Sequence, residues 1–153
     1  MGRAAVSARA LFTPDPRDTR RHGTIYLLHF SAPLQHARHY MGFVEGARLA
    51  QRMQRHALGT GSKLMAAVGR AGLSFVVARL WQGTRADERR LKRRKGATPY
   101  CPICAAAVGR TASVPHDLAP RTVPARWRSP ITPTTVFLRT PTDDDPTMRD
   151  DDD

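Results

Sequence analysis

Residues 24–44 read TIYLLHFSAPLQHARHYMGFV, and this stretch decides the fold. Its first part, residues 24–30, is a run of β-branched, aromatic and apolar residues of the kind found in buried strands. Its last part, residues 38–44, has the same character, and Pro33 lies in the connection. Because the connection is short, we expect the two runs to pair as an antiparallel hairpin.

Helical spacing follows the hairpin. Residues 46–58 place an apolar stripe on one face, while a second face is basic and carries Arg48, Arg52, Arg55 and His56. A shorter helix is expected from Ser62, a candidate N-cap, to residue 71.

A third strand is expected at residues 73–80, which read LSFVVARL. Thr84, with Asp87 three residues later, is a capping-box pattern for a helix that ends at Gly96. The order strand, strand, helix, helix, strand, helix predicts an α/β domain. We expect a small three-stranded, mainly antiparallel sheet flanked by helices.

Composition divides the chain around this domain. Seven prolines after residue 104 exclude long helices and central strands, although Trp127 and residues 134–138 are candidates to dock or to add an edge strand. The N-terminal residues lack the apolar stretch of a secretory signal; a flexible leader, an over-extended start and a transit-type segment are the alternatives. We therefore expect a disordered basic leader (1–22), the folded domain (23–98), a CxxC segment (99–104) and a proline-rich, largely disordered tail with an acidic end (105–153).

Charge points to a polyanionic partner. The net charge is +12, but residues 143–153 hold seven acids and one base, a net of −6. Residues 1–142 therefore hold 24 bases and six acids, a net of +18. A body of this charge binds nucleic acid through counterion release; basic tails that only aid solubility are the alternative.

The two cysteines, Cys101 and Cys104, exclude a disulfide framework and suit a reducing, cytoplasmic setting. No apolar run reaches the roughly 20 residues that span a bilayer, so we expect no membrane partner. Cys101-Pro102-Ile103-Cys104 is half of a zinc site, which would need two further ligands from His116 or a second chain. The simpler interpretation is a reduced thiol pair that ends the domain.

Several residues suit phosphodiester cleavage, which needs an activated water, neutralised phosphate charge and a stabilised leaving oxygen. Tyrosine can orient or deprotonate water, arginine grips phosphate oxygens, and a carboxylate holds a Mg²⁺-type ion. Here the chain resembles the GIY-YIG nuclease superfamily. The matching motifs are Thr24-Ile25-Tyr26 with threonine for the usual glycine, Tyr40-Met41-Gly42, residues 49–52 followed by His56, and Glu88 on the helix after the third strand.

The resemblance covers residues 23–96 and implies cleavage of DNA with one Mg²⁺ or Mn²⁺ ion, in repair, recombination or mobile-element processing. It implies Tyr26 as general base or water-positioning group, Tyr40 at the nucleophile or phosphate, Arg52 on the phosphate, His56 assisting and Glu88 on the metal. Arg48 is an alternative to Arg52, because the interval after Gly42 is about two residues longer than the family's. The expected DNA contacts are Arg48, Arg55, Arg89, Lys92 and Arg93.

Two other functions stay open. One is a catalytically weak DNA-binding module that keeps the fold and the basic surface. The other is an interaction protein built around Cys101 and Cys104. Each site residue also has a structural interpretation: the tyrosines as core aromatics, Arg52 and His56 as a solvated face, and Glu88 as a helix partner of Lys92.

Overall fold

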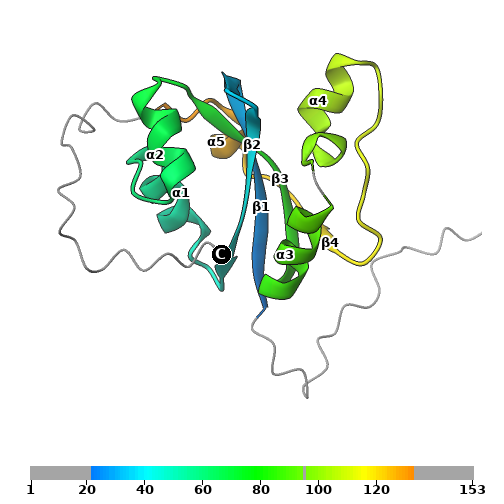
Figure 1. Cartoon of the computed structure of the whole chain (residues 1–153). Coiled ribbons are helices and arrows are strands. Elements are labelled where there is room, and N and C mark those ends of the chain that lie inside the picture. Colours follow the sequence, from blue (N-terminus) through cyan, green and yellow to red (C-terminus); the bar gives the residue numbers. More distant parts are fainter. Residues whose placement is uncertain (1–21, 95, 133–153) are drawn as a thin grey trace, which may run out of the picture.

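The computed structural model describes residues 22–94 and 96–132 (Figure 1). The predictions for the N-terminal leader, for an edge strand at residues 134–138 and for the acidic end concern residues 1–21 and 133–153. They lie outside the described residues.

Four antiparallel strands form one sheet, in the order β2-β1-β3-β4. They are β1 (His22–Leu34), β2 (Ala37–Glu45), β3 (Phe75–Thr84) and β4 (Ala119–Arg121). The antiparallel sheet and its first three strands are confirmed, but the predicted number of three strands is wrong. The fourth strand is only three residues long and contains Pro120. An edge strand tolerates proline because its outer side pairs with no other strand, so a backbone N–H on that side is not needed.

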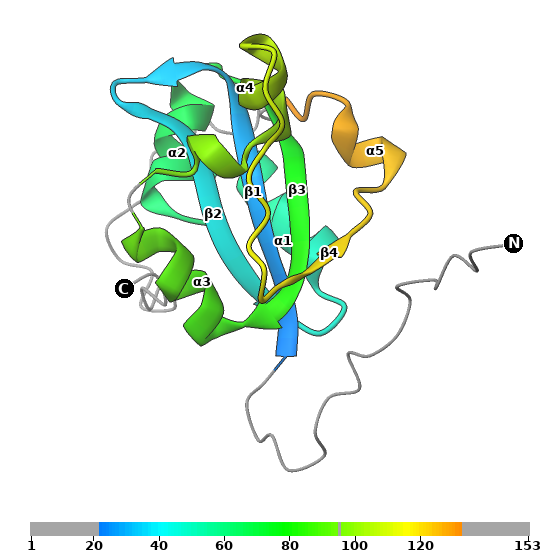
Figure 2. The same cartoon turned by 90° about the vertical axis from the view of Figure 1, so that its right-hand side faces the viewer.

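Helices cover both faces of this sheet (Figures 1 and 2). One face carries α1 (Leu49–Ala57) and α2 (Lys63–Arg70), with α5 (Ala125–Arg128) contributing Trp127. The other carries α3 (Arg85–Arg93) and, after a 3-10 turn at Thr98–Tyr100, α4 (Pro102–Ala107). The helices α1, α2 and α3 confirm the three that the sequence predicts, with ends shifted by one to three residues.

Side-chain alternation along β1 explains why residues 25–28 are apolar or aromatic without a polar residue between them. Tyr26, Leu28 and Phe30 are buried in the core beneath α1 and α2. Ile25 and Leu27 are buried in the second core, beneath α3 and α4. Because successive side chains of a strand point to opposite faces, a central strand covered on both sides must be apolar throughout. Tyr26 is thereby placed on the α1 side.

Residues 105–132 include two short elements and several contacts with β3, within the range for which the sequence predicts a largely disordered tail. Besides β4, this segment contributes Ile131, whose backbone N–H and C=O both pair with Phe75. Arg79 of β3 also donates hydrogen bonds to the carbonyl oxygens of Tyr100 at 3.1 Å and Ser113 at 2.8 Å. Dense proline excludes long elements, but it permits a short edge strand and a single helical turn.

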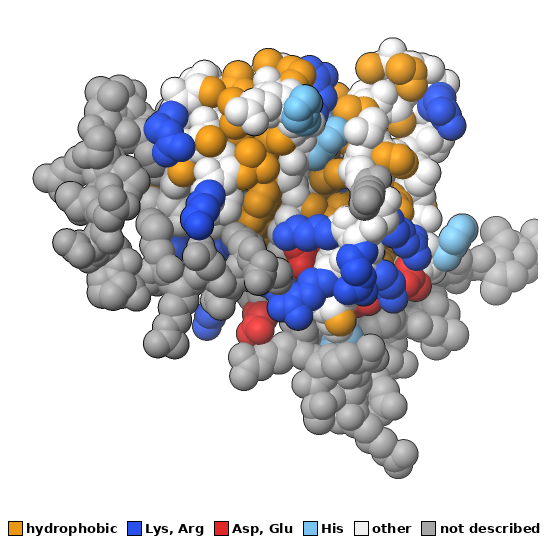
Figure 3. Space-filling model, in the orientation of Figure 1, with side chains coloured by type: hydrophobic (Ala, Val, Ile, Leu, Met, Phe, Trp, Pro, Cys, Tyr) orange, Lys and Arg blue, Asp and Glu red, His pale blue; other side chains and the backbone are white. Residues whose placement is uncertain are grey.

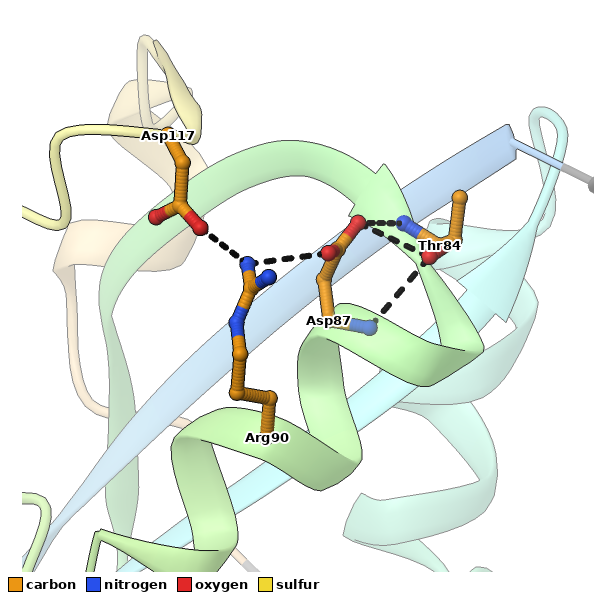
Figure 4. A network of polar contacts seen from close by, with 4 residues as sticks. All are labelled: Thr84, Asp87, Arg90 and Asp117. Carbon is orange, nitrogen blue, oxygen red and sulfur yellow. Dashed lines mark hydrogen bonds and ion pairs between the residues drawn. The ribbon is translucent and has the colours of Figure 1, made fainter.

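The N-terminal caps that the sequence predicts for α3 and α2 are present. Thr84 and Asp87 form the predicted capping box: the Thr84 N–H donates to Asp87 Oδ2 at 2.8 Å, and the Asp87 N–H donates to Thr84 Oγ1 at 3.2 Å. Arg90 bridges Asp87 and Asp117, which ties the later segment to α3 (Figure 4). Ser62 caps α2 as predicted, by accepting from the Met65 N–H.

Candidate active site and candidate metal centre

Tyr26 lies in the central strand directly opposite Gly42 of β2. The phenol ring passes over that glycine so closely that a Cβ there would lie 2.3 Å from the Tyr26 hydroxyl oxygen. The glycine of the second motif is therefore required by the tyrosine of the first, since any larger residue would displace the ring.

The Tyr26 hydroxyl is the hub of a polar cluster between β1 and α1. Its oxygen accepts a hydrogen bond from Arg52 Nε at 3.1 Å and lies 2.8 Å from His56 Nε2. A phenol has one proton to donate, so the hydroxyl donates to His56 when that ring nitrogen is unprotonated.

His56 is held in that neutral form. The side chain is 2% exposed, and burial, together with the charges of Arg52 and Arg55, lowers its pKa to about 3. The loop after α1 closes over the ring, because a Cβ on Gly61 would lie 2.1 Å from His56 Nδ1. His56 is thus a fixed, neutral imidazole with its Nε2 at the Tyr26 hydroxyl, and it accepts from that hydroxyl in the tautomer that carries its proton on Nδ1.

Tyr40 completes the aromatic part of the cluster. Its ring centroid lies 6.1 Å from that of Tyr26 and 5.1 Å from that of His56, edge to face with the latter. Lys92 of α3 places its Nζ 5.8 Å from the Tyr40 ring centroid, a cation–π contact. Tyr40 therefore connects the side chains of α1 with those of α3.

Glu88 is the buried acid of this region. It is 1% exposed, and its Oε1 lies 2.6 Å from Lys92 Nζ. No hydrogen bond from another described residue reaches that oxygen. A cation already stands against the carboxylate, so the position is suited to positive charge.

The surface around Glu88 is basic. Glu88 lines a depression of about 260 Å³ on α3 together with Arg85, Arg89, Lys92 and Arg93. Lysine and arginine side chains gather over α3 in the space-filling view (Figure 3). Arg89, Lys92 and Arg93, three of the expected DNA contacts, are exposed there.

The structure brings Tyr26, Tyr40, Arg52 and His56 together, and it connects Glu88 to them through Lys92. Contacts run from Arg52 to Tyr26, His56, Tyr40 and Lys92, and then to Glu88. Of the two candidate arginines, Arg52 reaches Tyr26, whereas Arg48 is exposed at the start of α1. Arg55, another expected DNA contact, is exposed and donates to the Thr60 carbonyl oxygen.

A second cluster lies at the other end of the strands, beside α4. It consists of His29, His39, Cys101 and Cys104, whose ligand atoms all lie within 4.8 Å of one another. His29 and His39 are register partners in β1 and β2, Cys101 is the N-cap of α4, and Cys104 is in its first turn. His116, which the sequence offered as a ligand, does not belong to this cluster.

Burial sets the protonation of this second cluster. It lowers the pKa of His29, and it lowers that of His39 to about 4, with His29 and Arg38 contributing. Burial raises the pKa of the Cys104 thiol. The two imidazoles are therefore neutral at pH 7, which is the form that binds metal ions.

Sequence reasoning missed His29 and His39 because their pairing depends on an irregular register. The tip of the hairpin pairs Leu34 with Ala37, and a regular ladder from there would place His29 opposite Gly42. The register shifts between His29 and Leu34, so His29 faces His39 instead. The available signal was two histidines in one predicted hairpin near a CxxC pair in a chain with six histidines.

Comparison of the chain with family models, curated proteins and solved structures found no significant match. Within residues 22–94 and 96–132, no helix has both the length and the apolar character to cross a bilayer.

Proposed function

We propose that the protein is an endonuclease of the GIY-YIG type, which hydrolyses DNA phosphodiester bonds with one Mg²⁺ or Mn²⁺ ion. The observation that carries the proposal is the Tyr26 hydroxyl, hydrogen-bonded to Arg52 at 3.1 Å and 2.8 Å from the neutral His56. The order of β1, β2, α1, α2, β3 and α3 also supports the proposal, although the sheet has a fourth strand, β4.

Tyr26 accounts for activation of water. It positions the attacking water with its hydroxyl oxygen or, as a phenolate, takes the proton of that water. His56 stays neutral, because its pKa is lowered to about 3, and it holds the Tyr26 hydroxyl by hydrogen bonding. Arg52 stabilises the negative charge that builds on the phenol oxygen and on the phosphate. Tyr40 packs against both rings and holds them in this geometry.

Glu88 is the residue that would hold the divalent ion. Its carboxylate is buried among cations, and Lys92 occupies the place where positive charge is favoured. Lys92 is 42% exposed, so its side chain has room to turn away from Glu88 toward a DNA phosphate. The ion supplies charge stabilisation at the leaving oxygen.

DNA is the substrate that the charge favours. The α3 surface carries Arg89, Lys92 and Arg93, side chains that bind phosphates without reading base sequence. These residues border the depression that contains Glu88, so a bound backbone would lie next to the proposed metal position.

The proposal is tested by nicking of supercoiled plasmid in Mg²⁺ or Mn²⁺. We expect Arg52→Ala and Glu88→Ala each to lower the nicking rate at least about 100-fold. Arg70→Ala, an exposed arginine in the last turn of α2, is the matched control and keeps the wild-type rate. Equal rates in wild type, Arg52→Ala and Glu88→Ala would overturn the proposal.

The second candidate is a catalytically weak DNA-binding module of the same fold. It is favoured by the ion pair of Glu88 with Lys92 and by the 1% exposure of the carboxylate, both of which oppose entry of a metal ion. This module would shift plasmid in a gel at low salt but would nick it in neither Mg²⁺ nor Mn²⁺.

A further inference from the structure

We propose that His29, His39, Cys101 and Cys104 bind one Zn²⁺ ion tetrahedrally, as a structural site that joins the β1–β2 hairpin to α4. The proposal does not depend on nuclease activity, because none of these residues belongs to the Tyr26 cluster. It also concerns a different ion from the one at Glu88, since thiolate and imidazole ligands select zinc over magnesium.

Four of the six separations among the ligand atoms are close to the edges of a tetrahedron around zinc, and the other two are within 4.8 Å. Zn–N distances of about 2.05 Å and Zn–S distances of about 2.3 Å give edges of about 3.4 Å between two nitrogens and about 3.6 Å between nitrogen and sulfur. His29 Nδ1 lies 3.2 Å from His39 Nε2. The Cys101 and Cys104 sulfurs lie 3.5 and 3.6 Å from His29 Nδ1, and Cys104 Sγ lies 3.3 Å from His39 Nε2.

Hydrogen bonding alone does not explain this convergence. His29 Nδ1 has three polar neighbours within 3.6 Å: His39 Nε2 and the two cysteine sulfurs. A ring nitrogen has either one proton or one lone pair, so it makes one good hydrogen bond. A central cation satisfies all four atoms at once, with both thiols giving up their protons on binding.

The ligand set indicates a structural site. Four protein ligands close the tetrahedron, whereas a catalytic zinc keeps one position for water or substrate. The site also needs no second chain, because two strands and one helix of the same chain supply every ligand.

The site fixes the hairpin to the segment that follows α3. The hairpin tip and α4 lie at the same end of the molecule (Figures 1 and 2). Cys101 is fully buried in the core beneath α3 and α4, so the metal would hold this core together at its edge. His39 directly precedes Tyr40, so binding would also fix the β2 backbone beside the Tyr26 cluster.

The test is metal binding by the full-length protein, reduced and freed of metal with a chelator. We expect one Zn²⁺ per chain. Co²⁺ should give the intense visible bands of tetrahedral coordination with a thiolate charge-transfer band in the near ultraviolet, and zinc should displace it. A Co²⁺ spectrum without the thiolate band, or a stoichiometry near zero, would overturn the proposal.

Variants locate the site. Cys101→Ser and His39→Asn should weaken zinc binding at least about 100-fold. The exposed histidines offer matched controls, so His36→Asn and His116→Asn should bind as wild type does. Unchanged binding in Cys101→Ser and His39→Asn would contradict the proposal.

If the variants do not fold, the proposal is tested by the reactivity of the thiols in the wild-type protein. Both thiols should react with a thiol reagent at least about tenfold more slowly in the zinc-loaded protein than after chelation. Equal thiol reactivity in the two states would overturn the proposal.

Discussion

At the scale of single residues, the proposed chemistry depends on the Tyr26 hydroxyl, which contacts two side chains of different charge, Arg52 and His56. Arg52 is a cation that donates to it, and His56 is a neutral base that accepts from it. Burial keeps His56 neutral far below pH 7, so it acts as a hydrogen-bond partner of the Tyr26 hydroxyl and not as a proton acceptor. This arrangement could not be predicted from spacing alone, since His56 follows Tyr26 by 30 positions and the hairpin turn lies between them.

The contact of Gly42 with Tyr26 gives a prediction for stability. Gly42→Ala would place a Cβ 2.3 Å from the Tyr26 hydroxyl oxygen, and we expect a loss of about 1–3 kcal/mol in the free energy of unfolding, with loss of nicking. Gly109→Ala is the control: nothing lies within 4 Å of its added Cβ, so only its positive φ costs, about 1 kcal/mol. Urea unfolding measures both. A Gly42→Ala protein as stable as wild type would contradict the close approach.

The neutral state of His56 predicts a pH dependence of stability. Its pKa is lowered from 6.5 to about 3 on folding, so the unfolded chain binds the extra proton. The stability from this residue is therefore complete above pH 6.5 and falls as the pH drops toward 3, by about 2 kcal/mol at pH 5. In urea unfolding, wild type should lose more free energy of unfolding between pH 7.5 and pH 5 than His56→Gln does, because the variant lacks the contribution of His56. An equally steep loss in the variant would show that His56 is not the cause.

At the scale of elements, the sequence was sufficient to predict those strands and helices whose residue pattern depends only on the element itself. The strands around Tyr26 and Tyr40, the capped helix with Glu88 and the basic helix with Arg52 all followed from local apolar periods and caps. It was insufficient where position depends on another element. The strand β4 is set by pairing with β3 rather than by its own three residues, one of them a proline.

The hairpin register shows the same limit. Three additional residues of β1 shift the ladder between His29 and Leu34. That shift places Tyr26 opposite Gly42 and His29 opposite His39, so one irregularity sets both clusters. The apolar pattern of β1 does not reveal this register shift, because every residue from Gly23 to Leu28 is buried whatever residue of β2 lies opposite.

The helix α3 predicts a competition between Lys92 and the metal. Because Lys92 neutralises Glu88, Lys92→Met should lower the Mg²⁺ concentration needed for half-maximal nicking several-fold while weakening DNA binding. Arg93→Met is the matched control. It removes a phosphate contact from the same helix without touching the described Glu88 ion pair, so DNA binding should weaken with no change in metal dependence. A higher Mg²⁺ requirement in Lys92→Met would contradict this role.

At the scale of the whole molecule, the sheet lies between two cores, and its strands contribute residues to both the Tyr26 cluster and the histidine–cysteine cluster. Tyr26 and Tyr40 belong to the core beneath α1 and α2, while Cys101 belongs to the core beneath α3 and α4. The hairpin β1–β2 contributes residues to both, so zinc binding at one end would steady the strands that carry the tyrosines at the other.

Charge gives a prediction at this scale. Residues 143–153 carry a net charge of −6 against +18 for the remainder, so they should compete with DNA for the basic surface. Deleting residues 143–153 should therefore tighten non-specific DNA binding at low salt, measured by fluorescence anisotropy, and the gain should shrink as salt rises. An affinity unchanged by the deletion would reject the competition.

We propose that the Tyr26 cluster, with a metal at Glu88, hydrolyses DNA. The hydroxyl group of Tyr26 is tested by the single-turnover cleavage rate of a saturating DNA substrate in Mg²⁺ for wild type and Tyr26→Phe, which differ by that one group. We predict metal-dependent cleavage by wild type and a rate at least about 100-fold lower in Tyr26→Phe, with DNA affinity unchanged within about twofold. Cleavage by Tyr26→Phe at the wild-type rate would contradict the account.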